Sequence, residues 1–134
     1  MEQERTQQQE WELQDQSFDF LKCAFDMLIW SHEKLQAACV QTHTYTDATT
    51  LRAKIEKHQA LEAEVDANAN QIVIIDNMGI EMIRQDHPKK LSIRRILDHL
   101  HMMWEGVRCR IAEEGRRLHQ AERYLKSYIK HNYF

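Results

Sequence analysis

Apolar residues recur at steps of three and four positions along most of this chain, in three long stretches. The first covers about residues 18–41, the second about 47–85 and the third about 90–128. Residues at these steps share one face of an α-helix, while the polar residues between them fill the opposite face. Only three glycines and one proline interrupt the whole chain. The pattern therefore predicts three long amphipathic helices.

The first predicted helix has a broader apolar face than packing against a single neighbour requires. Two adjacent stripes form that face: Phe18, Leu21, Phe25, Leu28 and Leu35, and beside them Phe20, Ala24, Met27 and Trp30. A helix that packs against two others needs a broad stripe, so burial in a core accounts for much of it. Residues 1–17 are rich in Gln and Glu, and we expect a solvated flank or a helical lead-in there.

The second predicted helix repeats every seven residues, at Leu51, His58, Val65 and Ile72. The apolar run at residues 72–75 on its own favours a strand, because β-branched side chains fit sheets well. The seven-residue period continues through that run, however, and no second strand pattern occurs in the sequence to pair with it. We therefore predict helix throughout.

Capping or helix-breaking residues stand at both ends of the second predicted helix. Residues 42–47 carry threonines and an aspartate that compete for backbone hydrogen bonds, and Thr46 or Asp47 is a suitable N-cap. At the other end stands Pro88, and the residue before a proline avoids helical backbone. The third helix is then predicted to begin between Lys89 and Ser92.

The third predicted helix has the most regular seam in the chain. Only Glu114 interrupts its alternation of four and three steps, which runs through Ile93, Leu97, Leu100, Trp104, Val107, Ile111, Leu118, Ala121, Leu125 and Tyr128. Gly106 and Gly115 each cost a helix interior about 1 kcal/mol relative to alanine, so packing has to offset them. The seven-residue period predicts an all-α fold, a left-handed antiparallel three-helix bundle about 50–60 Å long.

The order and spacing of these residues resemble the spectrin repeat family. Phe20-Leu21 followed by Trp30 resembles the first helix of the family. The run KHQALEAEV, residues 57–65, resembles the second helix, and its sequence is most similar to that of spectrin itself. The segment 79–88 is similar to the connection into the third helix, which Trp104 and the neighbouring seam continue. The resemblance covers residues 18–128, and it implies that residues 129–134 begin a linker to a following repeat.

The resemblance and the seams together identify a set of core anchors, which we expect to be buried between the helices. These residues are Phe20, Trp30, Leu51, His58, Leu61, Val65, Ile72, Ile93, Leu97, Leu100, Trp104, Val107, Ile111 and Leu118.

The chain departs from this family in the first helix. Phe25, Leu28 and Ile29 stand where similar repeats carry polar residues. An exposed apolar patch on a rod favours association. We therefore expect Phe25 and Leu28, with Trp11 and Phe18, to contact a neighbouring repeat or a partner chain.

Composition narrows the class of protein further. A chain of 134 residues fits one domain that can bury a core without a metal or disulfide. With 18 Lys and Arg against 21 Asp and Glu, nucleic acid is not indicated as a partner. The sequence contains no signal peptide and no apolar run of transmembrane length. Cys23, Cys39 and Cys109 are widely spaced, which predicts reduced cysteines packed in or near the core.

Eight histidines raise the question of a metal or catalytic site. His32-Glu33 lacks the second histidine of a zinc-binding HExxH motif. Asp98 and His101 share one side of the third helix, but a di-metal site also needs Glu-x-x-His pairs on other helices. His58, on the seam, suggests either a pH-sensitive group or, as the favoured alternative, a neutral histidine satisfied by a buried hydrogen bond. We predict no catalytic residue, no cofactor and no metal.

One charged cluster is a candidate contact surface. Lys89, Lys90, Arg94 and Arg95 gather at the start of the third helix, and we call them the basic strip. Further arginines recur along that helix. The strip could dock acidic lipid headgroups or a protein partner, and a simple solvated face is the favoured alternative.

The resemblance implies a structural rather than an enzymatic function. The expected role is an elastic rod or spacer repeat in an actin-associated cytoskeleton, in the cytoplasm beneath the plasma membrane. Its partners would be neighbouring repeats, with actin reached only through other domains of the parent protein. The alternative is a docking module whose first helix binds an adaptor, a partner spectrin-like chain or a second copy of itself.

Overall fold

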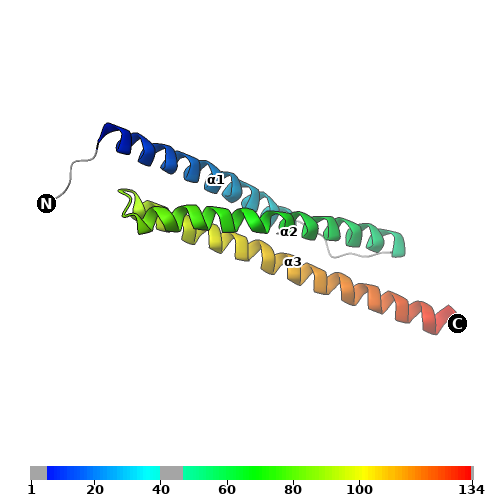
Figure 1. Ribbon diagram of the computed structural model, residues 1–134. Helices are drawn as coiled ribbons and strands as arrows, with labels where there is room; N and C mark the ends of the chain where they lie inside the picture. Colours follow the sequence, from blue (N-terminus) through cyan, green and yellow to red (C-terminus); the bar gives the residue numbers. More distant parts are fainter. Residues whose placement is uncertain (1–5, 40–46, 134) are drawn as a thin grey trace.

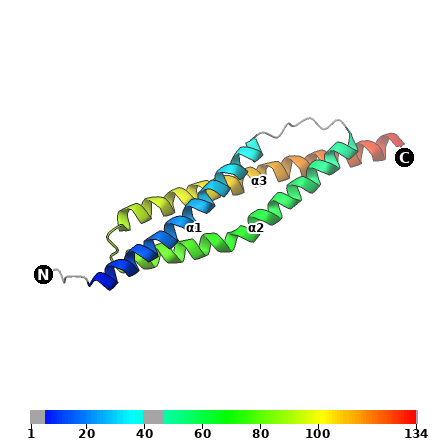
Figure 2. The ribbon, with the colours of Figure 1, turned by 90° about the horizontal axis from the view of Figure 1, so that it is seen from above.

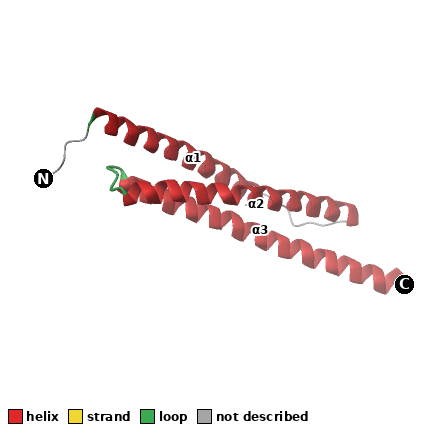
Figure 3. Ribbon diagram, in the orientation of Figure 1, coloured by secondary structure: helices red, strands yellow, loops and turns green. Residues whose placement is uncertain are grey.

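The protein forms a bundle of three long helices in a computed structural model that describes residues 6–39 and 47–133. Helix α1 spans Gln7–Cys39, α2 spans Ala48–Arg84 and α3 spans Lys90–Tyr133 (Figures 1 and 3). Each helix packs against both of the others. The predicted all-α three-helix bundle is confirmed.

The helices are arranged so that neighbours in sequence run antiparallel. Helices α1 and α3 point in the same direction and α2 points back between them, so α1 begins at one end of the bundle and α3 ends at the other (Figures 1 and 2). The helices contain 33, 37 and 44 residues. At about 1.5 Å per residue these correspond to roughly 50, 55 and 65 Å, so the bundle is a rod.

Helix α1 begins well inside the segment expected to be a flank or a helical lead-in. Thr6 and Gln9 cap its start reciprocally: the Gln9 amide donates to Thr6 Oγ1 at 3.2 Å, and the Thr6 amide donates to Gln9 Oε1 at 2.9 Å. This capping box satisfies two amides that the first helical turn leaves unpaired. The lead-in alternative thus describes residues 7–17, while the expected end of this helix near residue 41 lies outside the described residues.

The other helix ends follow their predicted signals. Asp47 is the N-cap of α2 and accepts a hydrogen bond from the Thr50 amide at 2.7 Å, which lowers the pKa of the Asp47 carboxyl. The alternative cap, Thr46, lies outside the described residues. Helix α2 ends at Arg84, and Asp86 then adopts a left-handed φ of 57° that lets the His87 amide reach back to the Met82 carbonyl. Helix α3 continues through Tyr133, into the residues 129–134 that were predicted to begin a linker to a following repeat.

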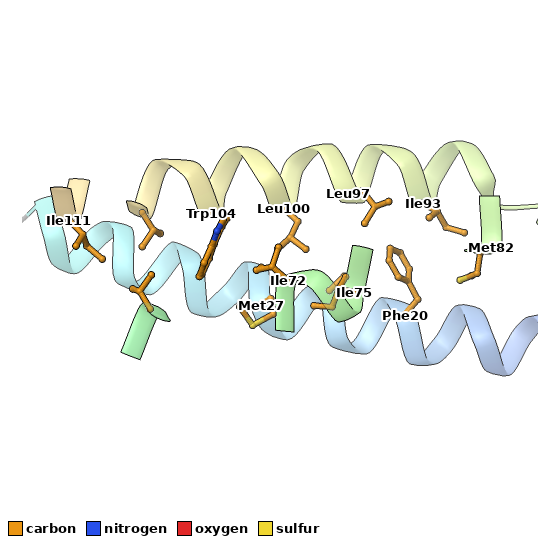
Figure 4. Close-up of a cluster of buried hydrophobic side chains, with 13 residues drawn as sticks. Phe20, Met27, Ile72, Ile75, Met82, Ile93, Leu97, Leu100, Trp104 and Ile111 are labelled. Atoms are coloured by element: carbon orange, nitrogen blue, oxygen red, sulfur yellow. The ribbon is translucent and has the colours of Figure 1, made fainter. Parts of the chain in front are cut away.

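The core is a single seam in which side chains from all three helices point toward one another (Figure 4). All the predicted anchors are buried except Trp30 and Leu61, which are half-buried and pack against the same cluster. In the β-branched run of α2, Ile72 and Ile75 are buried while Val73 and Ile74 are exposed. That alternation is helical, and it confirms the helix predicted there.

Gly79 lies where α2 packs closely against both other helices. A Cβ atom at this position would lie 2.9 Å from Leu97 Cδ1 and 3.0 Å from Phe20 Cε2. Both neighbours belong to the core, and the Phe20 ring is completely buried. A side chain at this position would therefore crowd both neighbours. By contrast, a Cβ at Gly106 would meet only Leu35, at 3.8 Å, which is ordinary van der Waals contact.

These two glycines give opposite predictions for the same substitution. Gly106→Ala should raise the free energy of unfolding by about 0.5–1 kcal/mol, because alanine favours helix and fits the space. Gly79→Ala should lower it by about 1–2 kcal/mol, since crowding the buried Phe20 ring outweighs the propensity gain. Urea denaturation followed by circular dichroism measures both, and a stabilised Gly79→Ala variant would refute the close approach.

Candidate functional site

The two core tryptophans meet at the level where all three helices are tied together. The rings of Trp30 in α1 and Trp104 in α3 lie 6.0 Å apart between centroids and are tilted by 31°. This separation is within the range of favourable aromatic pairs. On the other side, Trp30 Nε1 donates a hydrogen bond to Glu64 Oε1 of α2 at 3.0 Å. Trp30 therefore bridges α3 by its ring face and α2 by its polar edge.

Glu64 is the polar centre of this contact. Its Oε1 also accepts an ion pair from Lys34 Nζ of α1 at 2.8 Å. The hydrogen bond from Lys34, and then that from Trp30, hold the pKa of the Glu64 carboxyl below its usual range. Because the Glu64 side chain is partly exposed, solvent screens the pair and its contribution to stability is modest.

A second tie joins α1 to the turn between α2 and α3. His87 is buried, and its Nδ1 accepts a hydrogen bond from the Lys89 amide at 3.0 Å. That bond places the ring proton on Nε2, which therefore donates to the Leu13 carbonyl of α1 at 3.1 Å. The imidazole thus holds the first half of α1 against the turn.

His58 is buried on the seam, but the buried hydrogen bond expected for it is not formed. Neither ring nitrogen has a hydrogen-bond partner among the described residues. Its Nε2 lies 3.2 Å from Glu62 Oε1, close enough for electrostatic attraction although not in hydrogen-bond geometry. The facing residue explains the fit, because a Cβ at Gly115 would lie 3.1 Å from Nε2. Gly115 provides room for the imidazole, which is why α3 tolerates a glycine in its interior.

Glu114, which interrupts the line of apolar residues along α3, also has a structural role. Glu114 is buried, and its carboxylate lies 3.6 Å from the guanidinium of Arg117 one turn further on. Pairing of this kind offsets the cost of burying a charge.

The predicted partner-contact residues lie on the outside of α1. Trp11, Phe18 and Phe25 are exposed, as is the neighbouring Ile29. Leu28 differs from them, because it is half-buried and packs against the core. The basic strip, Lys89, Lys90, Arg94 and Arg95, is exposed as well, and Lys90 forms an ion pair with Asp86. Partner and lipid binding at these two surfaces stay predictions.

Other sequence-based candidates are separated by the fold or engaged elsewhere. His101 Nε2 lies 2.7 Å from Asp76 Oδ1 of α2, and no group of three or more His, Cys, Asp or Glu gathers as a metal site within residues 6–39 and 47–133. Cys23 is half-buried and free, whereas Cys109 is free and exposed, so the prediction of a position in or near the core was wrong for Cys109. The side chain of Cys39 lies outside the described ones. Cys109 falls off the α3 seam, on its solvent side. No helix in the described part of the chain combines the length and apolar character needed to span a bilayer.

Sequence reasoning missed the partners of Trp30 and the role of His87. Glu64 and Lys34 are ordinary charged residues in the sequence, and nothing in a single helix indicates that they meet. For His87 a weak signal existed in its place beside Pro88, in the turn that leads into α3.

Removing the Glu64 charge tests the tie between α1 and α2. Since the folded pKa is lowered, the charge contributes stability that is present above the usual glutamate pKa and is lost as pH falls through the lowered value. Glu64→Gln should therefore cost a few tenths to about 1 kcal/mol at pH 7, and this cost should shrink at pH 3. Urea denaturation at both pH values measures it. A difference that does not depend on pH would contradict the ion pair.

Removing the His87 ring tests the second tie. His87→Ala deletes two hydrogen bonds and a buried ring, so we expect the free energy of unfolding to fall by about 2–3 kcal/mol. The matched control is His99→Ala, an exposed histidine on α3, which should change it by less than about 0.5 kcal/mol. Equal effects of the two substitutions would rule out a special role for His87.

Comparison with known proteins agrees with this geometry. The family model for the spectrin repeat matches residues 15–120. The chain is 32% identical over 100 residues to the mouse spectrin alpha chain, erythrocytic 1, which covers 73% of this chain and 4% of that protein. It is 32% identical over 79 residues to the human spectrin beta chain, non-erythrocytic 5, covering 57% of this chain and 2% of that one. The Drosophila melanogaster spectrin beta chain is 28% identical over 105 residues, 78% of this chain and 4% of the relative.

This chain therefore spans only a small part of the length of each of these relatives. All three are spectrin chains, which confirms the resemblance to spectrin itself. The match covers the tryptophan pair, the turn at His87 and most of the shared core. The chain belongs to the spectrin repeat family.

Proposed function

We propose that this chain is a structural rod repeat, a spacer that gives length and elasticity to an actin-associated cytoskeleton beneath the plasma membrane. In this proposal it acts in tandem with neighbouring repeats, reaches actin only through other domains of a parent protein, and has no catalytic role. Similarity to spectrin alpha and beta chains supports the cytoskeletal setting.

The observation that carries the proposal is the direction of the chain through the bundle. Helix α1 begins at one end and α3 ends at the opposite end, so a pull on the two ends acts along the rod (Figure 1). Load along this axis slides the helices past one another. That motion is opposed by the whole seam and by the Trp30 and His87 ties together. Such a module resists as one unit and lengthens greatly once it opens.

A second candidate function is a docking module for another protein. It is favoured by the exposed apolar side chains of α1, which the bundle itself leaves uncovered. An adaptor, a partner spectrin-like chain or a second copy of this chain would each cover them.

Single-molecule stretching tests the spacer role. With the chain inserted between marker domains, we expect one cooperative opening and reversible refolding. Extension at about 3.5 Å per residue should add roughly 350–400 Å to the contour length. Leu100→Ala shortens a completely buried side chain of the core and should lower the free energy of unfolding by about 2–5 kcal/mol. The opening force should therefore fall. Gradual, non-cooperative extension would exclude this role.

A further inference from the structure

Helix α1 carries a second line of apolar side chains on its outer surface. Trp11, Phe18 and Phe25 are spaced by seven residues and are 58%, 67% and 49% exposed, and Ile29, one turn after Phe25, is 59% exposed. Seven residues make two helical turns, so these side chains lie along one line. We call the four residues the outer stripe.

The outer stripe continues into a regular seam. Between its members stand Leu21 and Leu28, which are half-buried and give the four–three alternation Phe18, Leu21, Phe25, Leu28. The core side of the same helix already has its own line through Phe20 and Met27. Helix α1 therefore has a second seam of the kind that packs against a parallel or antiparallel helix, and the bundle covers only its Leu21 and Leu28 edge.

The exposed area is large for a monomer. Aromatic side chains bury roughly 150–250 Å² each, so the outer stripe leaves roughly 400 Å² of apolar surface open per chain. That value lies within the range of the largest patches on soluble monomers, which are often functional. With the edges of Leu21 and Leu28 and the surrounding polar side chains, it approaches the roughly 800 Å² per partner of a stable interface.

Neighbouring contacts define the two sides of the outer stripe. Trp30 and Lys34 reach Glu64, so that side of α1 faces α2, and the exposed acids Asp19, Asp26 and Glu33 follow the same side at seven-residue spacing. Leu35 lies beside Gly106, so the other side faces α3. The outer stripe is therefore bordered by carboxylates on one side and by α3 on the other.

Charge is distributed unequally between these two helices. Helix α1 contains six acidic and two basic side chains, whereas α3 contains ten basic and five acidic ones. Helix α3 also exposes Leu91 and Met102, which are 72% and 65% exposed. Helix α3 thus carries both an excess of positive charge and exposed apolar side chains, and these complement the acidic helix α1 and its outer stripe.

We propose that a second copy of this chain covers the outer stripe, in a two-fold dimer whose axis runs parallel to the helices. This arrangement sets α1 of each copy against α3 of the other, so acidic and basic helices face each other twice. Pairing α1 with its own copy would place two acidic helices side by side. The two-fold symmetry makes a closed dimer, in which the outer stripe of each copy is covered by the other copy. The proposal deepens the docking function put forward above and rests on it.

Sedimentation equilibrium of the full chain tests the dimer. We expect a reversible monomer–dimer equilibrium that the double variant Phe18→Glu/Phe25→Glu weakens roughly a hundredfold in Kd. The matched control is Val73→Glu/Ile80→Glu, a pair on α2 with the same spacing and with 53% and 47% exposure, which should leave Kd unchanged. Circular dichroism verifies that each variant is folded, and Phe18→Gln/Phe25→Gln replaces the first pair if it is not.

Two outcomes would overturn the dimer: a monomer at every concentration, or equal weakening by the stripe and control pairs. Either result removes the self-association and leaves the spacer role standing, because cooperative opening under load tests that role separately.

Cross-linking tests which helices meet. A mixture of ¹⁴N- and ¹⁵N-labelled chains is treated with a carbodiimide, which joins carboxylates directly to lysines, and only mixed-isotope links are counted. The turn at His87 places the start of α3 beside Leu13 of α1, so we expect links from Asp15 or Asp19 of one copy to Lys89 or Lys90 of the other. Links to Lys22 of α1 instead would overturn the proposed arrangement.

Discussion

Burial of one line of apolar side chains from each helix holds this bundle together, and the other features of the fold are arranged around it. The line is continuous from Met82 and Ile93 at the turn to Ile111 well along α3 (Figure 4). Fully burying a large aliphatic or aromatic side chain stabilises a protein by about 1.5–3 kcal/mol, and such side chains recur about once per turn along this seam. The helices must therefore approach closely along their whole length. Gly79 helps to meet that requirement, because a Cβ atom there would crowd Leu97 and the Phe20 ring.

The polar contacts have a different task, since apolar packing alone allows one helix to slide past another by a turn. Glu64 with Trp30 and Lys34 joins α1 to α2, Asp76 with His101 joins α2 to α3, and His87 with Leu13 joins the turn between α2 and α3 to α1, each at one level only. A slide of one turn, about 5.4 Å, would break all of them. Each contributes less than the apolar seam as a whole, but together they fix the register in which Trp30 meets Trp104.

The sequence predicted the helices and most of the core, because the spacing of apolar residues within one helix already determines which face is buried. Contacts between helices could not be predicted in the same way. Whether Glu64 reaches Trp30 depends on the axial offset of α1 against α2, which no local spacing encodes. His58 illustrates the limit: its burial followed from the seam, but the space for its ring depends on Gly115, a residue on another helix. The early start of α1 is a different case, since the Thr6–Gln9 pair is a local signal that the sequence does contain.

The three tryptophans occupy three distinct environments, so their intrinsic fluorescence can report on different parts of the molecule. Trp104 is buried, Trp30 is half-buried against it, and Trp11 is exposed on a separate surface of the molecule. Indole fluorescence depends on the polarity around the ring, so the inner pair reports on the interior while Trp11 reports on whatever approaches α1. Replacing Trp11 alone, or the inner pair alone, would separate the two signals. Opening of the interior and coverage of the surface could then be followed independently in one sample, without any attached dye.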